Sequence, residues 1–269
     1  MLQYRGRYTD IGDYAFAGLT ELSSIEIEEG VQSIGEGAFA GCENLRTVIL
    51  PKSLETIAQD AFASCSKLRV VRQKKGKFVI NEEEAIFDLP DGIKKIGAGA
   101  FQGCTSIEGK VKLPQKLPVI ELLTFYRCGS ITSIDMPLKL TQIGEEAFAK
   151  CESIESCHFP KTLAKIDKMS FYSCTNLSDI KLNEGLLSIG ESAFNECGLE
   201  QVELPSTVEI IGEACFADCK NMGSFKSSPK ITTIPEDAFS GCTSLSSIEL
   251  NNGLIAIKES AFQDCDLSS

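Results

Sequence analysis

The sequence predicts an α/β solenoid, a rod of stacked repeats that each hold a short strand and a short helical turn. Two observations lead to it. A segment recurs along the chain at steps of mostly 23 residues, with one step of 22, one of 24 and one of 39, and a fixed period in this range marks repeat architectures. The chain is also 43% hydrophobic, enough to bury a long core. Eleven copies begin at Ile11, Ile34, Ile57, Ile96, Ile120, Ile143, Ile166, Ile189, Ile211, Ile234 and Ile257.

The first element of each copy is predicted to be a helical turn. In the second copy it reads AFAGC, which places Ala38, Phe39 and Cys42 three and four residues apart, on one face of a turn of helix. A single turn cannot bury that face by itself. Stacking would place Phe39 between Phe16 and Phe62, so that the repeats share one apolar column.

The second element is a short strand, LRTVIL in the same copy. Its alternation points Leu45, Val48 and Leu50 inward and Ile49 outward. A turn follows that uses Pro in some copies and Gly in others, and both residues suit tight turns. An apolar pair such as Leu54 and Ile57 then predicts a second, shorter extended segment.

The repeats divide the chain simply. Residues 1–10 are predicted to be an N-terminal partial repeat or edge, and residues 11–269 a single solenoid domain whose last repeat is incomplete. The 39-residue step contains an insertion at about residues 72–88, which predicts a projecting hairpin or a degenerate repeat. Because the last copy stops where its strand should begin, we expect the chain to be part of a longer protein.

The unit IG-x-x-AF-x-x-C-x-x-L, together with the strand pattern L-x-x-I-x-L, resembles the BspA-like (Treponema-type) leucine-rich repeats. The resemblance extends over Ile11 to Leu267. It implies a leucine-rich repeat solenoid from an extracellular or surface-associated protein that engages host proteins, other cells or polymers. It implies no shared active site.

The twelve cysteines are predicted to be buried, reduced, small apolar residues. Ten of them occupy one repeat position, and the first copy has Leu19 there, so the position is interpreted as apolar. Disulfides and metal ligation are the alternatives. Only Cys215 and Cys219 have a zinc-like spacing, and the chain contains a single histidine to complete such a site.

Other residue types also fail to predict a catalytic, cofactor or metal site. His158 is the only histidine, and it lies at an outward strand position. Acidic groups such as Glu82–Glu84 and Glu145–Glu146 are interpreted as a solvated surface in a chain of net charge -12. The glycines that follow the first isoleucine of many copies are interpreted as turn glycines. The prediction is a protein that is not an enzyme and carries no cofactor.

Binding is therefore expected at the outward positions of the strands, because stacking fixes the inward ones. The central outward residues are Glu26, Ile49, Arg72, Lys112, Asp135, His158, Lys181, Glu203, Lys226 and Glu249. This row mixes both charges and has no aromatic residue, which favours a protein surface as ligand. A solvated face without a ligand is the alternative. The acidic balance excludes nucleic acid, and no segment is apolar enough to insert into a membrane.

The predicted function is a protein-binding recognition domain of a cell-surface or secreted, adhesin-like leucine-rich repeat protein. Its ligand would be a host or extracellular-matrix protein, or a surface polymer. Two alternatives remain. An intracellular, cytoplasmic scaffold is favoured by the reduced cysteines and by the lack of a signal peptide in this sequence, and an accessory binding module would serve a larger enzyme.

Overall fold

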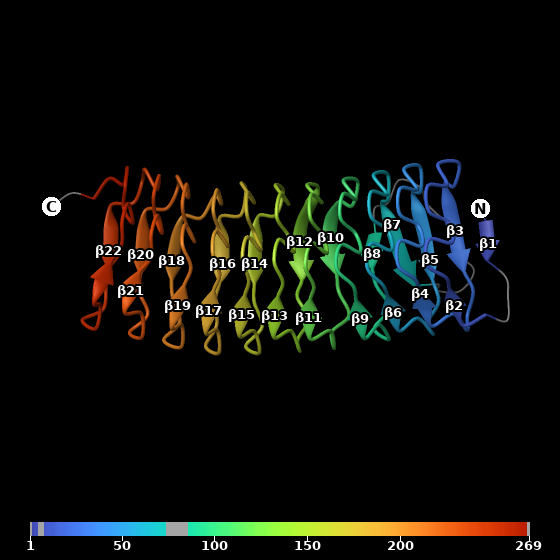
Figure 1. Cartoon of the computed structure of the whole chain (residues 1–269), viewed down its shortest axis with the longest axis horizontal. Helices are drawn as coiled ribbons and strands as arrows, with labels where there is room; N and C mark the ends of the chain where they lie inside the picture. The colour runs from blue at the N-terminus through green and yellow to red at the C-terminus, as the bar shows by residue number, and fades with distance from the viewer. Residues whose placement is uncertain (1, 5–7, 74–85, 268–269) are drawn as a thin grey trace.

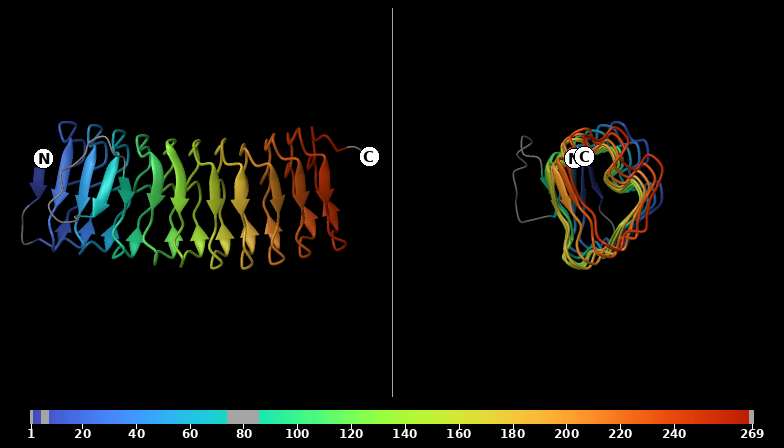
Figure 2. Two further views of the ribbon diagram at one scale, coloured as in Figure 1. Left: turned by 180° about the vertical axis from the view of Figure 1, so that it is seen from behind. Right: turned by 90° about the vertical axis from the view of Figure 1, so that its left-hand side faces the viewer.

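The protein is a straight rod of stacked rungs, seen in a computed structural model that describes residues 2–4, 8–73 and 86–267. The two termini lie at opposite ends of the rod (Figure 1). Viewed along the rod, successive rungs superpose around a common core (Figure 2). The stacking follows from the repeat, since each rung buries the same apolar positions against its neighbours.

The long-strand side is one wall of the rod. Its strands run parallel in register, so that Ile25 pairs with Val48 and Val48 with Val71. They are β1 (Leu2–Tyr4), β3 (Ser24–Ile27), β5 (Thr47–Leu50), β7 (Val70–Gln73), β8 (Ile86–Asp88), β10 (Gly109–Lys112), β12 (Ile131–Asp135), β14 (Ser156–His158), β16 (Asp179–Lys181), β18 (Gln201–Glu203), β20 (Ser224–Lys226) and β22 (Ser247–Glu249).

The short-strand side carries the second extended segment of each rung, which confirms that prediction. Its strands are β2 (Asp10–Ile11), β4 (Ser33–Ile34), β6 (Thr56–Ile57), β9 (Lys95–Ile96), β11 (Val119–Ile120), β13 (Gln142–Ile143), β15 (Lys165–Ile166), β17 (Ser188–Ile189), β19 (Ile210–Ile211), β21 (Thr233–Ile234) and β23 (Ala256–Ile257). In each pair of neighbouring strands the isoleucine is stacked on an isoleucine, as with Ile11 and Ile34.

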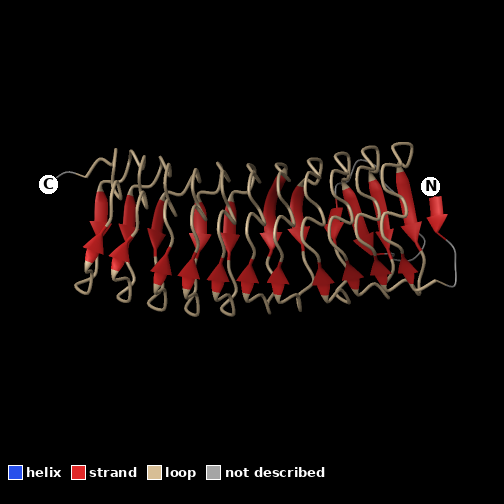
Figure 3. Ribbon diagram, viewed as in Figure 1, coloured by secondary structure: helices blue, strands red, loops and turns tan. Residues whose placement is uncertain are grey.

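The predicted helical turns are wrong: the described residues contain no helix (Figure 3). The N–H groups of Gly37 and Phe39 donate to the next rung, to the carbonyls of Gln59 (2.9 Å) and Ala61 (2.8 Å). The intervening N–H groups of Ala38 and Ala40 instead donate three residues back. An α-helix needs every N–H to reach four residues back, so a ladder between rungs replaces it.

This phenylalanine turn needs two left-handed residues in every rung. In the second rung they are Gly37 and Gly41, with φ of 55° and 71°, whereas the third rung uses Asp60 and Ser64, with φ of 53° and 59°. Non-glycine residues rarely adopt this conformation because it crowds Cβ. The turn that they form directs every second N–H group, such as those of Gly37, Phe39 and Gly41, to a carbonyl of the next rung, and those hydrogen bonds offset the strain.

The phenylalanine column predicted from the repeat is confirmed. Phe39 stacks on Phe16 with ring centroids 5.2 Å apart and on Phe62 at 5.1 Å. The column continues through Phe101, Phe125, Phe148, Phe171, Phe194, Phe216, Phe239 and Phe262, and each ring is stacked on the next. One ring from each rung therefore forms a continuous core.

The thiols of the cysteine column also make hydrogen bonds, which their interpretation as apolar residues did not include. Each thiol of the column points to the carbonyl of the phenylalanine one rung earlier, as in Cys42 to Phe16 (3.0 Å) and Cys151 to Phe125 (3.1 Å). All twelve cysteines are free thiols, and eleven are buried. A thiol is a weak donor that also packs as a small apolar group. Leu19, in the first copy, is 46% exposed.

The glycines that follow the first isoleucine of a copy, interpreted as turn glycines, lie directly before the phenylalanine turn. Gly97, Gly190 and Gly212 have no positive φ. A Cβ atom at Gly212 would lie 2.3 Å from the backbone nitrogen of Glu191, and one at Gly97 would lie 2.4 Å from that of Gln59. These glycines let neighbouring rungs approach closely.

The described part of the 39-residue step adds one strand to the long-strand side. β8 lies parallel between β7 and β10, pairing Phe87 with Val71 and with Val111. Phe62 nevertheless stacks directly on Phe101, so the extra strand has no phenylalanine turn of its own. The rest of the predicted insertion, residues 74–85 with the acidic residues 82–84, lies outside the described residues.

Candidate ligand-binding face

The row of outward residues lies on the long-strand side, and strand pairing sets neighbours side by side. Glu26 pairs with Ile49, and Ile49 with Arg72. Farther along, Lys112 pairs with Asp135, His158 with Lys181, and Lys226 with both Glu203 and Glu249; these pairs complete the residues predicted for this row. Sequence reasoning missed Asp88, which sits between Arg72 and Lys112 on the extra strand β8.

Opposite charges on adjacent rungs pair along this row. Lys112 Nζ lies 3.1 Å from Asp88 Oδ1, and Lys226 Nζ lies 2.9 Å from Glu203 Oε1. The hydrogen bond with Glu203 raises the pKa of Lys226, and the one with Asp88 raises the pKa of Lys112. His158 Nε2 lies 3.3 Å from Asp179 Oδ2. Exposed pairs of this kind add little stability, so their main effect is to fix the charge pattern of the face.

The face is accessible at one end and covered at the other. Ile49 is only 6% exposed, and its outer-side neighbours Thr47 and Val70 are 7% and 5% exposed. Flanked in register by Glu26 and Arg72, Ile49 presents almost no surface to a ligand. Lys181, Glu203, Lys226 and Glu249 are all exposed.

A groove of about 790 Å³ crosses the exposed end, over β16, β18, β20 and β22. Lys181, Glu203, Lys226 and Glu249 line it together with turn residues such as Pro205. Its lining includes Ile180 and Leu182, which pack against the core and are half-buried, whereas the equivalent Val202 is buried. Charged residues beside a partly apolar lining suit a protein surface, because such interfaces combine an apolar centre with a polar rim.

The groove lies where one repeat is a residue short. Between Cys197 and Leu199 stands only Gly198, whereas two residues separate Cys174 from Leu177. A Cβ atom at Gly198 would lie 2.5 Å from the carbonyl oxygen of Thr175, so the shortened turn presses on the rung before it. The ladder of the long-strand side ends at this step, between β16 and β18, as it also does between β12 and β14. The 22-residue step was therefore a visible sign of this site in the sequence.

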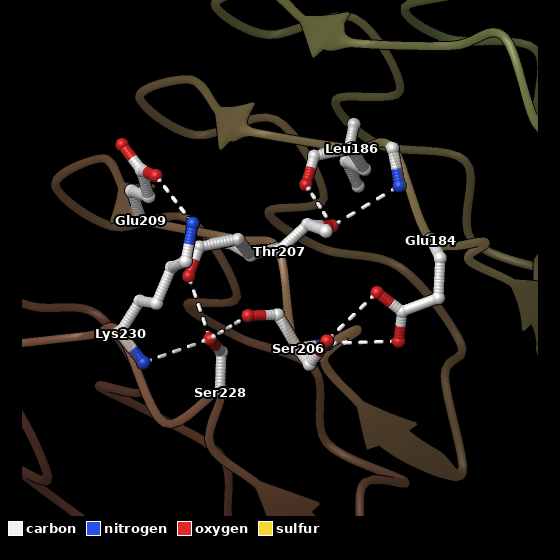
Figure 4. Close-up of polar contacts among 9 residues, drawn as sticks. Glu184, Leu186, Ser206, Thr207, Glu209, Ser228 and Lys230 are labelled. Carbon is white, nitrogen blue, oxygen red and sulfur yellow. Dashed lines mark hydrogen bonds and ion pairs between the residues drawn. The ribbon is translucent and has the colours of Figure 1, made fainter.

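Interlocking turns hold the edge of the groove (Figure 4). Glu184 accepts hydrogen bonds from the backbone N–H of Ser206 (3.1 Å) and from its hydroxyl (2.9 Å), which lowers the pKa of the Glu184 carboxyl. Thr207 accepts from the N–H of Gly185 (3.1 Å) and donates to the carbonyl of Leu186 (2.7 Å). A Glu-Gly turn is thus clasped by the Pro-x-Ser/Thr turn of the next rung.

The same clasp joins an earlier pair of rungs. Glu29 accepts from the N–H of Lys52 (3.0 Å), and Ser53 accepts from the N–H of Gly30 (2.9 Å) while donating to the carbonyl of Val31 (2.8 Å). The two turn chemistries seen in the sequence are therefore complementary partners as well as alternatives. Their side chains hold the loops beside the outer face in fixed positions.

The described residues offer few groups for chemistry. No three or more His, Cys, Asp or Glu side chains among them gather closely enough to hold a metal ion. Burial raises the pKa of the thiols, to about 12 for Cys65 and Cys128, so they are protonated at neutral pH and poor nucleophiles. The described residues contain no helix that could cross a membrane.

Comparisons with known proteins agree with this architecture. A family model described as "BspA type Leucine rich repeat region" matches residues 3–84, 80–185 and 141–268. No curated protein sequence matches the chain.

Solved structures of bacterial proteins share the fold. A leucine-rich repeat protein from Bacteroides ovatus is 24% identical, with a TM-score of 0.76 over 95% of this chain and 68% of that one. A leucine rich cell surface protein from Faecalibacterium prausnitzii is 25% identical, with a TM-score of 0.61 over 97% of this chain and 76% of that one. The pneumococcal vaccine antigen PcpA is 20% identical, with a TM-score of 0.53, 93% of this chain and 65% of that chain being covered. With its family model matched along almost its whole length, this chain belongs to the BspA type leucine-rich repeat family.

Proposed function

We propose that this chain is a non-enzymatic recognition domain of a cell-surface or secreted, adhesin-like protein, and that it binds a protein ligand through the groove over β16–β22. One observation carries the proposal: the groove places exposed charges of both signs beside half-buried apolar residues, on a rigid repeated core. The surface location rests on the likeness to the Faecalibacterium protein, which is called a cell surface protein.

The charge pattern indicates what the partner must offer. Glu203, Lys226 and Glu249 stand on three successive rungs, spaced about 4.8 Å apart as in any sheet. A partner that presents basic groups to the glutamates and an acidic group to the lysine would match this alternation. Ile180 and Leu182 would receive an apolar side chain between those polar contacts.

The test measures binding of the whole chain to immobilised fibronectin, laminin and collagen, as a panel of extracellular-matrix proteins. Lys226→Glu should weaken binding to the recognised protein at least about tenfold, because it sets like charges beside Glu203 and Glu249. Arg127→Glu is the matched control: it makes the same charge change on the phenylalanine-turn side, where Glu196 occupies the equivalent position.

The outcomes separate the groove from nonspecific charge effects. Binding that falls for Lys226→Glu and persists for Arg127→Glu supports the proposal. Equal losses in both variants would show that net charge alone governs binding, and no binding to any of the three proteins would refute the matrix-protein ligand.

A further inference from the structure

A second groove lies where β3, β5 and β7 begin. These strands are at the other end of the rod from β18, β20 and β22 (Figure 1). The groove has a volume of about 690 Å³, and its lining includes Ser23, Arg46, Lys67, Arg69 and Ser106. It occupies the edge of the long-strand side next to the phenylalanine turns, whereas the groove over β16–β22 reaches the opposite edge, at turn residues 182–184.

This groove concentrates positive charge in an acidic protein. Among its described lining residues three are cationic and one, Glu21, is anionic, although the chain has a net charge of -12. Arg46 and Arg69 are on adjacent rungs, since the Arg69 N–H donates to the Arg46 carbonyl (3.1 Å). Like charges one rung apart repel each other, so this arrangement favours an anion between them.

Most of this charge is not neutralised within the described part of the chain. Arg69 pairs with Glu108. Lys67 Nζ donates to the neutral amide oxygen of Asn44 (2.7 Å). The exposed Arg46 side chain makes no hydrogen bond or ion pair with any described residue. At the position of Arg46, other rungs have Ser23, Glu155, Ser178, Glu200 and Ser246, so the fold does not require an arginine there.

The remaining lining is rich in hydroxyl groups. Thr20, Ser23, Ser24 and Ser106 contribute to it. The described lining residues include no aromatic residue, and the one aliphatic residue among them, Val70, is 5% exposed. A peptide ligand normally anchors apolar or aromatic side chains in pockets, and the described residues of this groove form no such apolar pocket. Hydroxyl groups beside guanidinium groups instead match a ligand that carries many hydroxyls together with carboxylate or sulfate groups.

We propose that the groove at the start of β3, β5 and β7 binds an anionic polysaccharide, with Arg46, Lys67 and Arg69 contacting its carboxylate or sulfate groups. The ligand runs along the edge of the rod across three rungs, and the serine and threonine hydroxyls contact its sugar hydroxyls. This site is independent of the protein-binding groove over β16–β22.

The experiment measures binding of the whole chain to four polymers: polygalacturonate, chondroitin sulfate, neutral dextran and poly-glutamate. We expect binding to one or both of the acidic polysaccharides. Comparing polygalacturonate with chondroitin sulfate shows whether carboxylate or sulfate is the group recognised. Replacing Arg46 with Ser, the residue at the same position of the first rung, should weaken that binding roughly tenfold, the loss of one charge-assisted contact. Raising the salt to about 1 M should weaken it further, because the screening length falls to about 3 Å.

Arg127→Ser is the matched control, since it removes one exposed arginine elsewhere and leaves a serine where Ser64 and Ser173 adopt the same backbone conformation. Circular dichroism verifies that both variants are folded. Three results would overturn the proposal: no binding to either acidic polysaccharide, poly-glutamate binding at least as tightly as they do, or Arg127→Ser weakening binding as much as Arg46→Ser.

Discussion

The two ends of the long-strand side have the same kind of core, but their outer residues are covered at one end and exposed at the other. Beneath β5 and β7 lie Phe62 and Cys65, and beneath β18 and β20 lie Phe216 and Cys219, all fully buried. On the outside, Thr47, Ile49 and Val70 are almost completely covered at the first end, whereas Gln201, Glu203 and Lys226 are exposed at the second. Stacking constrains only the inward positions, so this repeat can carry unlike surfaces at its two ends without any change to its interior.

The largest effect that we expect is a loss of stability at high pH, which would test whether the same buried thiol column runs through the whole rod. Burial raises the pKa of Cys65, Cys128 and Cys174 to about 12, above the ordinary value of 9.0. These thiols contribute fully to stability below about pH 9, and the contribution is lost as the pH rises toward 12. We expect the free energy of unfolding to fall by about 1.4 kcal/mol per pH unit for each such thiol.

Urea denaturation at pH 8, 9.5 and 10.5 measures this loss. Cys128→Ala should reduce the pH dependence by the share of one thiol. Stability that stays constant between pH 8 and pH 10.5 would contradict the buried thiol column.

Cutting the phenylalanine column between the two ends should have the next largest effect. Phe148 stacks on Phe125 at 5.5 Å and on Phe171 at 5.3 Å. Phe148→Ala would leave a cavity in the middle of the rod and lower the free energy of unfolding by about 3–5 kcal/mol. Phe148→Leu, which fills most of that space, should cost clearly less, and urea denaturation compares the two. A loss below about 1 kcal/mol for Phe148→Ala would mean that the rungs do not depend on ring stacking.

Exchanging outer residues tests the difference between the surfaces. Ile49→Glu introduces a charge at a position that is 6% exposed, and should destabilise the protein by about 1–3 kcal/mol. The reciprocal change Glu203→Ile, at an exposed position of the same row, should stay within about 1 kcal/mol, including the lost ion pair with Lys226. Thermal unfolding of both variants makes the comparison, and equal losses would show that the ends do not differ in cover.

The smallest expected effect tests a feature that the two ends share. Ser53→Ala and Thr207→Ala each remove a hydroxyl that accepts a glycine N–H and donates to a carbonyl of the preceding rung. Each change should lower the free energy of unfolding by about 1 kcal/mol, because the clasp is the same at both ends. Urea titrations that gave clearly different losses would show that the clasp depends on its surroundings.

The sequence predicted the interior better than the turns. Phe39 recurs at a fixed spacing, so the stack with Phe16 and Phe62 followed directly from the repeat. The segment AFAGC fitted a helical turn because its apolar residues are three and four positions apart. The observed turn buries the same residues, but sends the N–H groups of Gly37 and Phe39 to the next rung, a non-local partner that no local pattern reveals.

The same limit applies to the binding face. The outward residues could be predicted from strand alternation. The burial of Ile49 and the contribution of Ile180 and Leu182 to the groove could not be predicted in this way. Ile180 and Leu182 are half-buried beside the interruption between β16 and β18. The missing residue beside Gly198 was visible in the sequence, but its effect depends on how the neighbouring rungs pack.

The side chains that face inward follow from the repeat alone, because every rung must bury the same apolar positions to stack on the next. The groups that meet between rungs are known only from the three-dimensional arrangement of the rungs. The carbonyl contacts of the cysteine column, the left-handed residues of each turn and the two grooves all depend on how neighbouring rungs are placed. That placement exists only once the rungs are stacked.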